Sequence, residues 1–329
     1  MKVIKNIEVP TGNILIGGNE KVKFEFLSIG DYGKEANIKA DFLNLKEDIN
    51  GVPNGDIMPL SEKWVVTIST QTGCSMGCTF CDVPKVGKGL NLSNKEMNFQ
   101  ITEALKLHPE ITATKRLNIH YARMGEPTFN VEVLKNARGL LKTVRPYVGR
   151  SMVHPVVSTM MPKENIHLIK FLNDWCDIKN NNFRGEAGLQ LSINSTDDKQ
   201  REQMFNGNSL SLGEISDICR WLPDPVGRKY TLNFALADGY KISASKLRRL
   251  FNPVKFIVKL TPMHETAACK SNKIETTDGY EYFTPYKKTE ENLKSVGFDV
   301  LVFVPSYDED NSRITCGNAI LSDKHIMED

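Results

Sequence analysis

Three cysteines lie within eight residues, in the segment QTGCSMGCTFC that contains Cys74, Cys78 and Cys81. Thiolates at the spacing Cys-x3-Cys-x2-Cys repel one another unless they share a cation, so the spacing indicates a metal centre. Zinc is one alternative, but a structural zinc site uses four ligands and no second Cys or His pair follows nearby. A cubane iron–sulfur cluster held by three cysteines leaves one iron open to a substrate or cofactor. A disulfide beside one free thiol is the third alternative, and a reducing compartment disfavours it.

The composition is that of an ordinary globular protein. Of the 329 residues, 40% are hydrophobic and 25% are charged, with a formal net charge of +2. This balance excludes a polycationic nucleic-acid coat protein but leaves room for a local basic groove. No run approaches the roughly 18 apolar residues of a membrane span, and no apolar run follows the charges at the N-terminus. Seven cysteines are too few for a disulfide scaffold of this length, so we expect a cytoplasmic protein.

From Trp64 onwards, β-rich runs alternate with amphipathic helical runs. Apolar periodicity and a capping box at Ser93 and Glu96 predict a helix over 94–107. The repeated β-then-α units predict a parallel sheet with right-handed crossovers and favour a partial (β/α)6 TIM-like barrel, although an open doubly wound sheet would use the same elements. The strands are expected at 64–70, 117–122, 155–159, 189–194, 231–236, 254–260 and 300–304, and the other helices at 131–144, 164–175, 212–222, 244–251 and 289–296.

The first 63 residues differ from the rest. The runs 22–29 and 36–43 flank the short turn sequence GDYG and predict a β-hairpin. The polar stretch 44–63, which contains several Gly and Pro residues, predicts a linker or long surface loop. We therefore expect a small β-rich N-terminal segment and linker over 1–63, and a barrel with a C-terminal cysteine loop over 64–329.

The cysteine segment resembles the cluster-binding signature of radical S-adenosylmethionine (SAM) enzymes, including the aromatic Phe80 before the third cysteine. Over most of 22–319, further motifs are similar to those of the RlmN/Cfr group of RNA adenine methyltransferases. They are STQTGC at 69–74, GLNLS at 89–93 with EM at 96–97, MGEP at 124–127 with Asn130, VST at 157–159, LSIN at 191–194 and TCG at 315–317. Most follow consecutive expected strands, and barrel enzymes assemble their active sites on that face.

The resemblance implies a [4Fe–4S] cluster held by Cys74, Cys78 and Cys81, and a SAM molecule bound beside it. A carboxylate can accept hydrogen bonds from the SAM ammonium group, and hydroxyls can bond to its carboxylate or ribose. The residues implied in SAM binding are Gly125, Glu126, Ser158, Ser192, Asn194 and His264, the last of which stands where the group usually has an Asn.

In this group, one SAM molecule methylates a C-terminal cysteine and a second is cleaved reductively to a 5′-deoxyadenosyl radical. That radical takes a hydrogen from the S-methyl group, and the resulting carbon radical adds to adenine. The resemblance implies Cys316 as the methyl carrier here. A lone cysteine is more often a buried structural thiol, but the polar residues on both sides of Cys316 favour a loop.

The chain departs from the group at three points. Seven residues before the first cluster ligand the group has a second cysteine, whose disulfide releases the product. Thr67 stands there in this chain, and a hydroxyl cannot perform thiol–disulfide exchange. The group's upstream glutamate, proposed to accept a proton, aligns near Lys39, with Glu35 and Asp41 close by. A short β-rich segment stands in place of the group's N-terminal helical domain.

Three further cysteines could replace the missing thiol. Cys176 and Cys219 lie in helical patterns, which favours a place in the core for both. Cys269 follows the sixth barrel strand in an expected loop and is the least implausible replacement.

Two enzyme hypotheses follow, both with an electron donor such as flavodoxin or ferredoxin. The first is a methyltransferase that uses Cys316 to modify an RNA nucleobase; the second is a radical SAM enzyme with diverged chemistry on a nucleotide or small molecule. A structural iron–sulfur or zinc protein would leave the SAM motifs unexplained. RNA binding would need a basic groove, which the net charge does not support. The candidate basic residues are Lys85, Lys88 and Arg123 beside the expected active face, and Lys246, Arg248, Arg249, Lys287 and Lys288 elsewhere.

Overall fold

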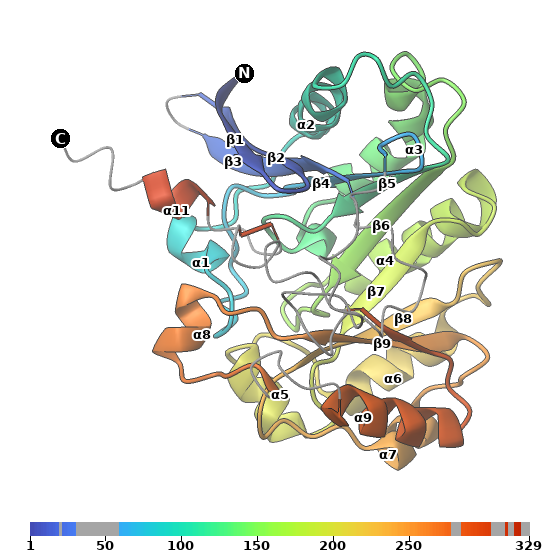
Figure 1. Ribbon diagram of the computed structural model, residues 1–329. Helices are drawn as coiled ribbons and strands as arrows, with labels where there is room; N and C mark the ends of the chain where they lie inside the picture. The colour runs from blue at the N-terminus through green and yellow to red at the C-terminus, as the bar shows by residue number, and fades with distance from the viewer. Residues whose placement is uncertain (20–21, 31–58, 278–283, 304–312, 315–318, 324–329) are drawn as a thin grey trace.

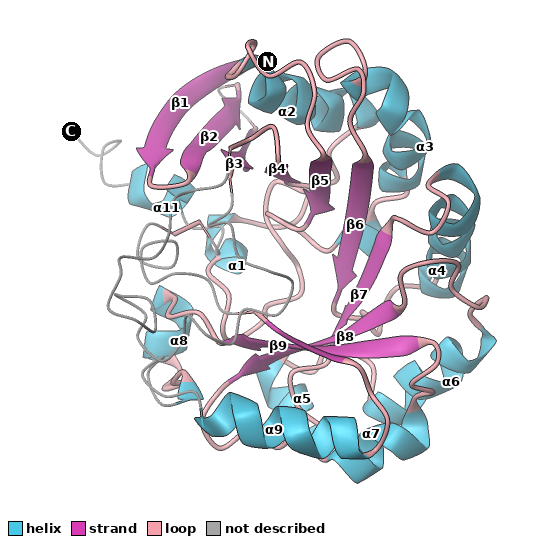
Figure 2. Cartoon of the chain, turned by 45° about the vertical axis from the view of Figure 1, so that its right-hand side comes forward, coloured by secondary structure: helices cyan, strands magenta, loops and turns pink. Residues whose placement is uncertain are grey.

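The computed structural model describes residues 1–19, 22–30, 59–277, 284–303, 313–314 and 319–323 (Figure 1). Within these ranges, ten strands form one sheet in which each strand pairs with its neighbour in the chain. Figure 2 shows the sheet curved around an interior, with the longer helices on its outer side. The strands β1 and β10 are the two edges of the described sheet, so the barrel is open.

Seven parallel strands make the barrel wall, and each was expected from the sequence within a few residues. Their parallel pairing arises because each is followed by a crossover that returns along the outer side of the sheet. They are β4 (Lys63–Ile68), β5 (Arg116–Tyr121), β6 (Val153–Thr159), β7 (Gly188–Ser192), β8 (Tyr230–Leu236), β9 (Phe256–Pro262) and β10 (Val300–Val302).

Three antiparallel strands extend this sheet at its N-terminal side: β1 (Lys2–Val9), β2 (Gly12–Gly18) and β3 (Lys23–Ile29). At the end of β3, Ile29 has Gly12 of β2 on one edge and Val65 of β4 on the other. The expected hairpin would pair the end of β3 with residues 36–43. That pairing is wrong at Ile29, because β2 and β4 already pair with this residue on its two sides. Residues 36–43 lie outside the described ranges, as does most of the expected linker, so the division at residue 63 stays a prediction.

The six helices expected from periodicity are present. The capping box is confirmed, since Ser93 Oγ accepts from Glu96 N at 3.3 Å while Glu96 Oε2 accepts from Ser93 N at 2.7 Å. The third of these helices begins at 168 and not at 164, and the last begins at 284 and not at 289. The six are α2 (Asn94–Lys106), α3 (Glu132–Val144), α4 (Leu168–Asp177), α6 (Leu212–Trp221), α7 (Ala244–Leu250) and α9 (Thr284–Ser295).

Several short elements were not expected, because one or two turns are too short to show periodicity. A π-helical turn, η3 (Ile178–Asn182), continues α4, and a single turn, η2 (Pro127–Phe129), follows β5. The other short helices are α1 (Val83–Val86), α5 (Asp198–Met204), α8 (Ala267–Ser271) and α11 (Ala319–Asp323). Several of them surround the cysteine segment.

Candidate active site

The cysteine segment begins where β4 ends, at the carboxyl edge of the parallel strands. Thr70 N donates to Met124 O at 2.9 Å, which ties the segment to the turn after β5. Gly73 lies so close to Gly87 that an added Cβ would stand 2.0 Å from the carbonyl oxygen of Gly87. Position 73 therefore requires glycine because two stretches of main chain touch there.

The three cysteines of this segment are present as thiols, with Cys74 and Cys78 buried and Cys81 half-buried. Burial raises the pKa of Cys74 to about 11, and burial followed by the charge of Cys74 raises the pKa of Cys78. A metal centre would displace these protons on binding. In the part of the chain that the structure describes, no three His, Cys, Asp or Glu side chains converge on one ion position. A cubane cluster binds each thiolate through a different iron, so three neighbouring thiols on one loop fit it.

The far side of the segment rests on α5 and on the residues after β6. Thr79 N donates to Met204 O at 2.9 Å, at the end of α5. Cys78 Sγ lies 3.2 Å from Met160 Sδ, directly after β6. The thiols are thus fixed between the carboxyl ends of β4 and β6.

The Gly-Glu-Pro turn follows β5 beside the cysteine segment. Gly125 has a φ of +95°, and an added Cβ would lie 2.6 Å from Gln71 Cβ. Glu126 is buried, and its carboxylate accepts from Thr128 Oγ1 at 2.7 Å and from Met160 N at 2.9 Å. Burial raises the pKa of Glu126, while these hydrogen bonds act in the opposite direction. The Glu126 carboxylate therefore holds the turn against β6, and its lone pairs serve protein donors.

Two amide side chains join the cysteine segment to this turn. Gln71 Oε1 accepts from Glu126 N at 2.8 Å, and Gln71 Nε2 donates to Asn91 Oδ1 at 2.8 Å. Asn130 Nδ2 donates to the main-chain oxygens of Thr70 and Leu92, at 2.8 and 2.7 Å. The sequence motifs contained both amides but did not show that they form the physical link between the motifs.

Ser158 and Ser192 face the interior of the barrel. They lie two residues beyond Val156 and Gln190, which line an interior cavity, and alternate residues of a strand share a face. Within the described ranges neither hydroxyl makes a hydrogen bond, so both are available to a ligand at the carboxyl end of the barrel.

Asn194 and His264 follow β7 and β9. Asn194 has a φ of +58° and is buried, and its Oδ1 accepts from Ala235 N at 3.1 Å. Part of its amide therefore serves to join the ends of β7 and β8. His264 lines the interior cavity, as a ligand-facing residue after β9 would.

The interior cavity measures about 360 Å³ and runs along the inside of the strands. Barrel interiors are usually filled by branched apolar side chains. Here the lining includes four cations that were not expected from the sequence: Lys63, Arg116, Arg228 and Lys259. The sequence did contain an indication of these cations, because Lys259 lies between the apolar residues Val258 and Leu260, which are buried in β9.

Arg123, at the end of β5, binds the C-terminal part of the chain. Its guanidinium donates to Arg313 O at 3.0 Å and to Ile314 O at 2.6 Å. Its Nε lies 2.7 Å from Glu25 Oε1, in an ion pair whose side chains are at most 2% exposed and whose angle is unsuited to a hydrogen bond. Glu25 Oε2 in turn accepts from Ile320 N at 3.2 Å.

These contacts lie on both sides of Cys316, which is itself outside the described ranges. Ile314 lines the interior cavity, so the described residues before Cys316 reach the barrel interior. Thr67 lines the same cavity, whereas Cys269 is buried elsewhere, with its Sγ 3.5 Å from Phe80 O. The alternative proton acceptors at 35, 39 and 41 lie outside the described part of the chain.

Three of the basic residues considered for RNA make contacts within the protein. Arg123 is buried against Glu25, and Lys85 pairs with Asp82 at 3.2 Å. Lys246 donates to Thr196 O at 2.6 Å. These three cations are therefore engaged within the protein.

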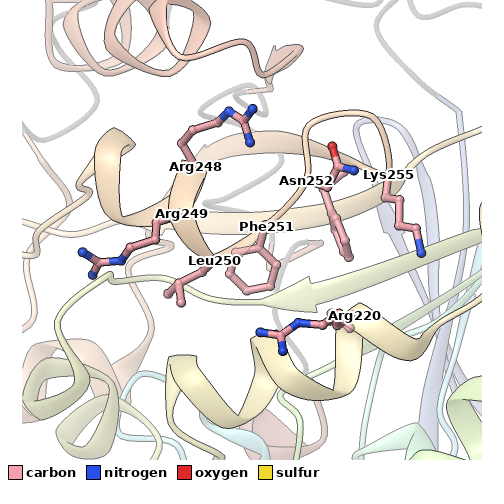
Figure 3. Close-up of a pocket in the computed structure, with 9 residues that line it drawn as sticks. Arg220, Arg248, Arg249, Leu250, Phe251, Asn252 and Lys255 are labelled. Atoms are coloured by element: carbon pink, nitrogen blue, oxygen red, sulfur yellow. The ribbon is translucent and has the colours of Figure 1, made fainter.

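A second pocket, of about 470 Å³, lies between α6 and α7 on the outer side of the barrel. Its basic side chains are Arg220, Arg248, Arg249 and Lys255. Figure 3 shows these four side chains pointing in different directions, and Lys255 pairs with Asp224 at 2.9 Å. They do not converge on one ligand position.

The sequence is similar to curated proteins named dual-specificity RNA methyltransferase RlmN. It is 29% identical over 216 residues to RlmN 2 of Myxococcus xanthus, covering 63% of this chain and 54% of that protein. It is 29% identical over 231 residues to RlmN of Helicobacter hepaticus, covering 68% and 58%. The chain thus spans little more than half the length of these relatives. No family model matches the chain.

The structure is similar to that of a radical SAM methyltransferase from Sphaerobacter thermophilus, with a TM-score of 0.64 and 20% sequence identity. The match covers 92% of this chain and 76% of that one. The structural likeness confirms the expected fold class, a TIM-like barrel, which is open among the described residues. The sequence similarity confirms the resemblance to the RlmN/Cfr group. No helix among the described residues has the length and hydropathy to cross a membrane.

Proposed function

We propose that this relative of the RlmN proteins is a radical SAM enzyme that methylates an RNA nucleobase through Cys316. One observation carries the proposal. The cysteine segment and the Gly-Glu-Pro turn follow β4 and β5, and the hydroxyls of Ser158 and Ser192 lie at the carboxyl ends of β6 and β7, all at one edge of the barrel. This edge is where barrel enzymes assemble their active sites.

In this proposal Cys74, Cys78 and Cys81 hold a [4Fe–4S] cluster, and its fourth iron is left for SAM. When bound, the cluster supplies the electron for reductive cleavage of SAM, delivered by a donor such as flavodoxin or ferredoxin. We therefore propose that the enzyme works in the cytoplasm, where such electron donors are found.

The residues around the cluster divide the binding of SAM between them. Ser158 and Ser192 offer hydroxyls that can bond to the carboxylate or ribose of SAM. Glu126 contributes by fixing the turn, because its carboxylate is already hydrogen-bonded within the protein. His264 and Asn194 follow β9 and β7, and His264 lines the interior cavity.

Cys316 is proposed as the methyl carrier because the residues beside it are held at the cavity. Arg123 binds the main chain just before it and Glu25 binds the main chain just after it. No cysteine lines the cavity among the described residues, and Thr67 takes the position of the group's resolving thiol. Product release through a disulfide at position 67 is therefore not available to this chain.

A second candidate function keeps the cluster and SAM but takes a nucleotide or other small molecule as substrate. The observation that favours it is the cationic lining of the barrel interior. Of the basic residues considered for RNA, in contrast, Lys85, Arg123 and Lys246 are engaged within the protein.

Anaerobic reconstitution with iron and sulfide tests the core of the proposal. We expect a cubane cluster spectrum and release of 5′-deoxyadenosine from SAM once a reductant is added. Replacing Cys74, Cys78 and Cys81 by Ala should abolish both signals, because the thiolates are the only proposed ligands. Cys219→Ala is the matched control, since that buried thiol lies on α6 and should leave both unchanged. Stoichiometric zinc with no iron would overturn the assignment.

Mass spectrometry of the C-terminal peptide tests the methyl carrier. After incubation with SAM and a reduced cluster, Cys316 should gain the mass of one methyl group. Cys269, buried beside Phe80, should stay unmodified and serves as an internal control. A Cys316 that is never methylated, in protein that does cleave SAM, would remove the methyl-carrier mechanism and leave diverged chemistry.

A further inference from the structure

Besides Arg123, which is paired with Glu25, four cations line the interior cavity, and they occupy two levels of the barrel wall. Lys63 and Arg116 are register partners at the first positions of β4 and β5, and Arg228 lies two residues before β8. Lys259 lies in the middle of β9, opposite Leu301 of β10. All four line the same cavity, so strands distant in the sequence point their charges into one space.

In the described part of the chain, no carboxylate lines this cavity. Arg116 Nε donates to Asn118 Oδ1 at 3.2 Å, and Lys259 Nζ lies 4.9 Å from the centre of the Phe303 ring. These partners are uncharged, and no ion pair within the described ranges neutralises either cation.

Arg228 is only partly neutralised. It donates to the main-chain oxygen of Glu186 at 3.2 Å, and the Glu186 carboxylate lies 3.2 Å from His154. Burial, followed by the charge of Arg116, lowers the pKa of Arg228, while the charge of Glu186 acts in the opposite direction. Like charges gathered in a poorly solvated space raise the free energy of the folded state. A bound anion would relieve that repulsion.

The cations influence the groups around them. Burial lowers the pKa of Lys259 to about 8, and the charges of Lys63 and Arg228 add to the effect. Burial, followed by the charges of Lys259 and Arg228, lowers the pKa of His120 to about 3. The interior is thus strongly positive around an imidazole that stays neutral at physiological pH.

We propose that the barrel interior binds the phosphate of a free nucleotide, held by Arg116, Arg228 and Lys259. Binding of the nucleotide stands on the cavity alone; that this ligand is the substrate rests on the second candidate function, a radical SAM enzyme that acts on a nucleotide or other small molecule. A volume of about 360 Å³ lies in the range of small-molecule sites, roughly 300–1,000 Å³. Asn118, Gln190 and Thr231 also line the space and can hydrogen-bond phosphate or sugar oxygens.

The position of the cations favours a small ligand over a polynucleotide. They lie at the start or middle of strands whose carboxyl ends carry the cysteine segment, and a six-residue strand spans roughly 20 Å at most. A nucleotide can extend from that edge with its base near the cluster and its phosphate below. A nucleotide with a terminal phosphate can end inside the barrel. The backbone of an RNA strand would have to enter and leave the barrel through the same opening.

Calorimetric titration of the full-length protein, without reductant, tests the site. The probes are adenosine, AMP, ADP and pyrophosphate, at fixed ionic strength because charge-driven binding is screened by salt. We expect AMP and ADP to bind at least about tenfold more tightly than adenosine, as charge-assisted hydrogen bonds to the phosphate require. Pyrophosphate should compete with ADP.

The variants Arg116→Met, Arg228→Met and Lys259→Met should each weaken ADP binding by about tenfold or more. Arg248→Met removes the same charge from the outer pocket and is the matched control, with binding unchanged. Thermal melting identifies any variant that fails to fold, and Lys259→Arg, which keeps the charge, should retain binding.

Two results would overturn the site: equal affinity for adenosine and AMP, or an equal loss of affinity in Arg248→Met and the interior variants. The site would also be overturned if an RNA oligonucleotide bound with the same affinity to the wild type and to the interior variants while AMP did not bind. SAM cleavage plays no part in the measurement. Nucleotide binding without SAM cleavage therefore removes only the proposed function, and SAM cleavage without nucleotide binding removes only this site.

Discussion

Lys259 shows how a single residue can reveal what a barrel interior is suited to hold. It lies between two buried apolar residues of β9, and burial together with neighbouring cations lowers its pKa from 10.5 to about 8. Between these two values the unfolded chain binds one more proton than the folded chain. The free energy of unfolding therefore increases with pH across that window, and below it the buried charge destabilises the fold. An anionic ligand that favours the protonated form would offset this.

The affinity for ADP should accordingly fall as the pH rises through about 8, where Lys259 loses its proton. The groups that face it are Lys63, Arg116 and His120 from β4 and β5, Arg228 before β8, and His264 and Phe303 after β9 and β10. The phosphate is already doubly charged over this range, since its second pKa is about 6. Calorimetry in two buffers of different ionisation enthalpy should show proton uptake on binding above pH 8.

Lys259→Arg is the control for this pH dependence, because a guanidinium stays charged throughout the range. Its ADP affinity should stay nearly constant between pH 7 and pH 9. A wild-type affinity that does not change with pH, or a variant that follows the same slope, would contradict the role given to Lys259.

Glu126 illustrates the limit of reading a motif residue by residue. Its carboxylate was expected to receive the SAM ammonium group, yet Thr128 and Met160 already donate to it within the protein. The neighbouring Gly125 has a conformation that L-residues rarely adopt, with φ at +95°. The motif thus encodes a tight turn, and only the structure shows which of its atoms remain for a ligand.

At the scale of elements, the barrel could be predicted because its strands and long helices carry clear periodicity. All seven parallel strands were expected within a few residues, and the capping box placed the start of α2 correctly. The strands β1 and β2 were missed. One is half-exposed along its length, and the other, GNILIGG, contains three glycines that resemble a turn.

Part of the candidate site could likewise be predicted from the sequence, and part could not. The cluster cysteines could be placed because they follow a predicted strand, and the serines at 158 and 192 because they lie near the ends of predicted strands. The cations of the cavity could not, because their convergence depends on register between strands, such as the pairing of Lys63 with Arg116. The spacing of residues in a sequence shows which side chains of one segment lie close together. In a barrel interior, side chains from different strands lie close together, and sequence spacing does not show this.

At the scale of the whole molecule, one buried ion pair joins the two ends of the chain. Glu25 belongs to the N-terminal strand β3, while its partner Arg123 follows β5. Together they bind main-chain atoms at 313, 314 and 320, and an apolar cluster of Ile14, Leu27, Ile29, Ile314 and Ala319 surrounds the contact. Figure 1 shows α11 beside the N-terminal strands. The N-terminal sheet extension thus supports the segment that contains the proposed methyl carrier.

Arg123→Met should therefore destabilise the fold and release the C-terminal segment, because it leaves Glu25 buried without its cation. Removing one partner of a buried pair reduces the free energy of unfolding by roughly 3–5 kcal/mol. The double variant Glu25→Gln with Arg123→Met should recover part of this loss, because no unpaired charge remains. Urea denaturation measures these changes. Lys170→Met, in the exposed pair with Asp174, is the control and should cost at most roughly 0.5 kcal/mol.

Hydrogen exchange then separates anchoring from general instability. In Arg123→Met, amides at 313–314 and 319–320 should lose protection at denaturant concentrations where amides of β5 and β6 keep theirs. If protein with an intact cluster is tested, methylation of Cys316 should slow while SAM cleavage continues, because Arg123 contacts neither the thiols nor the Gly-Glu-Pro turn side chains. Unchanged exchange at both flanks would show that the ion pair stabilises the barrel without positioning the C-terminal segment.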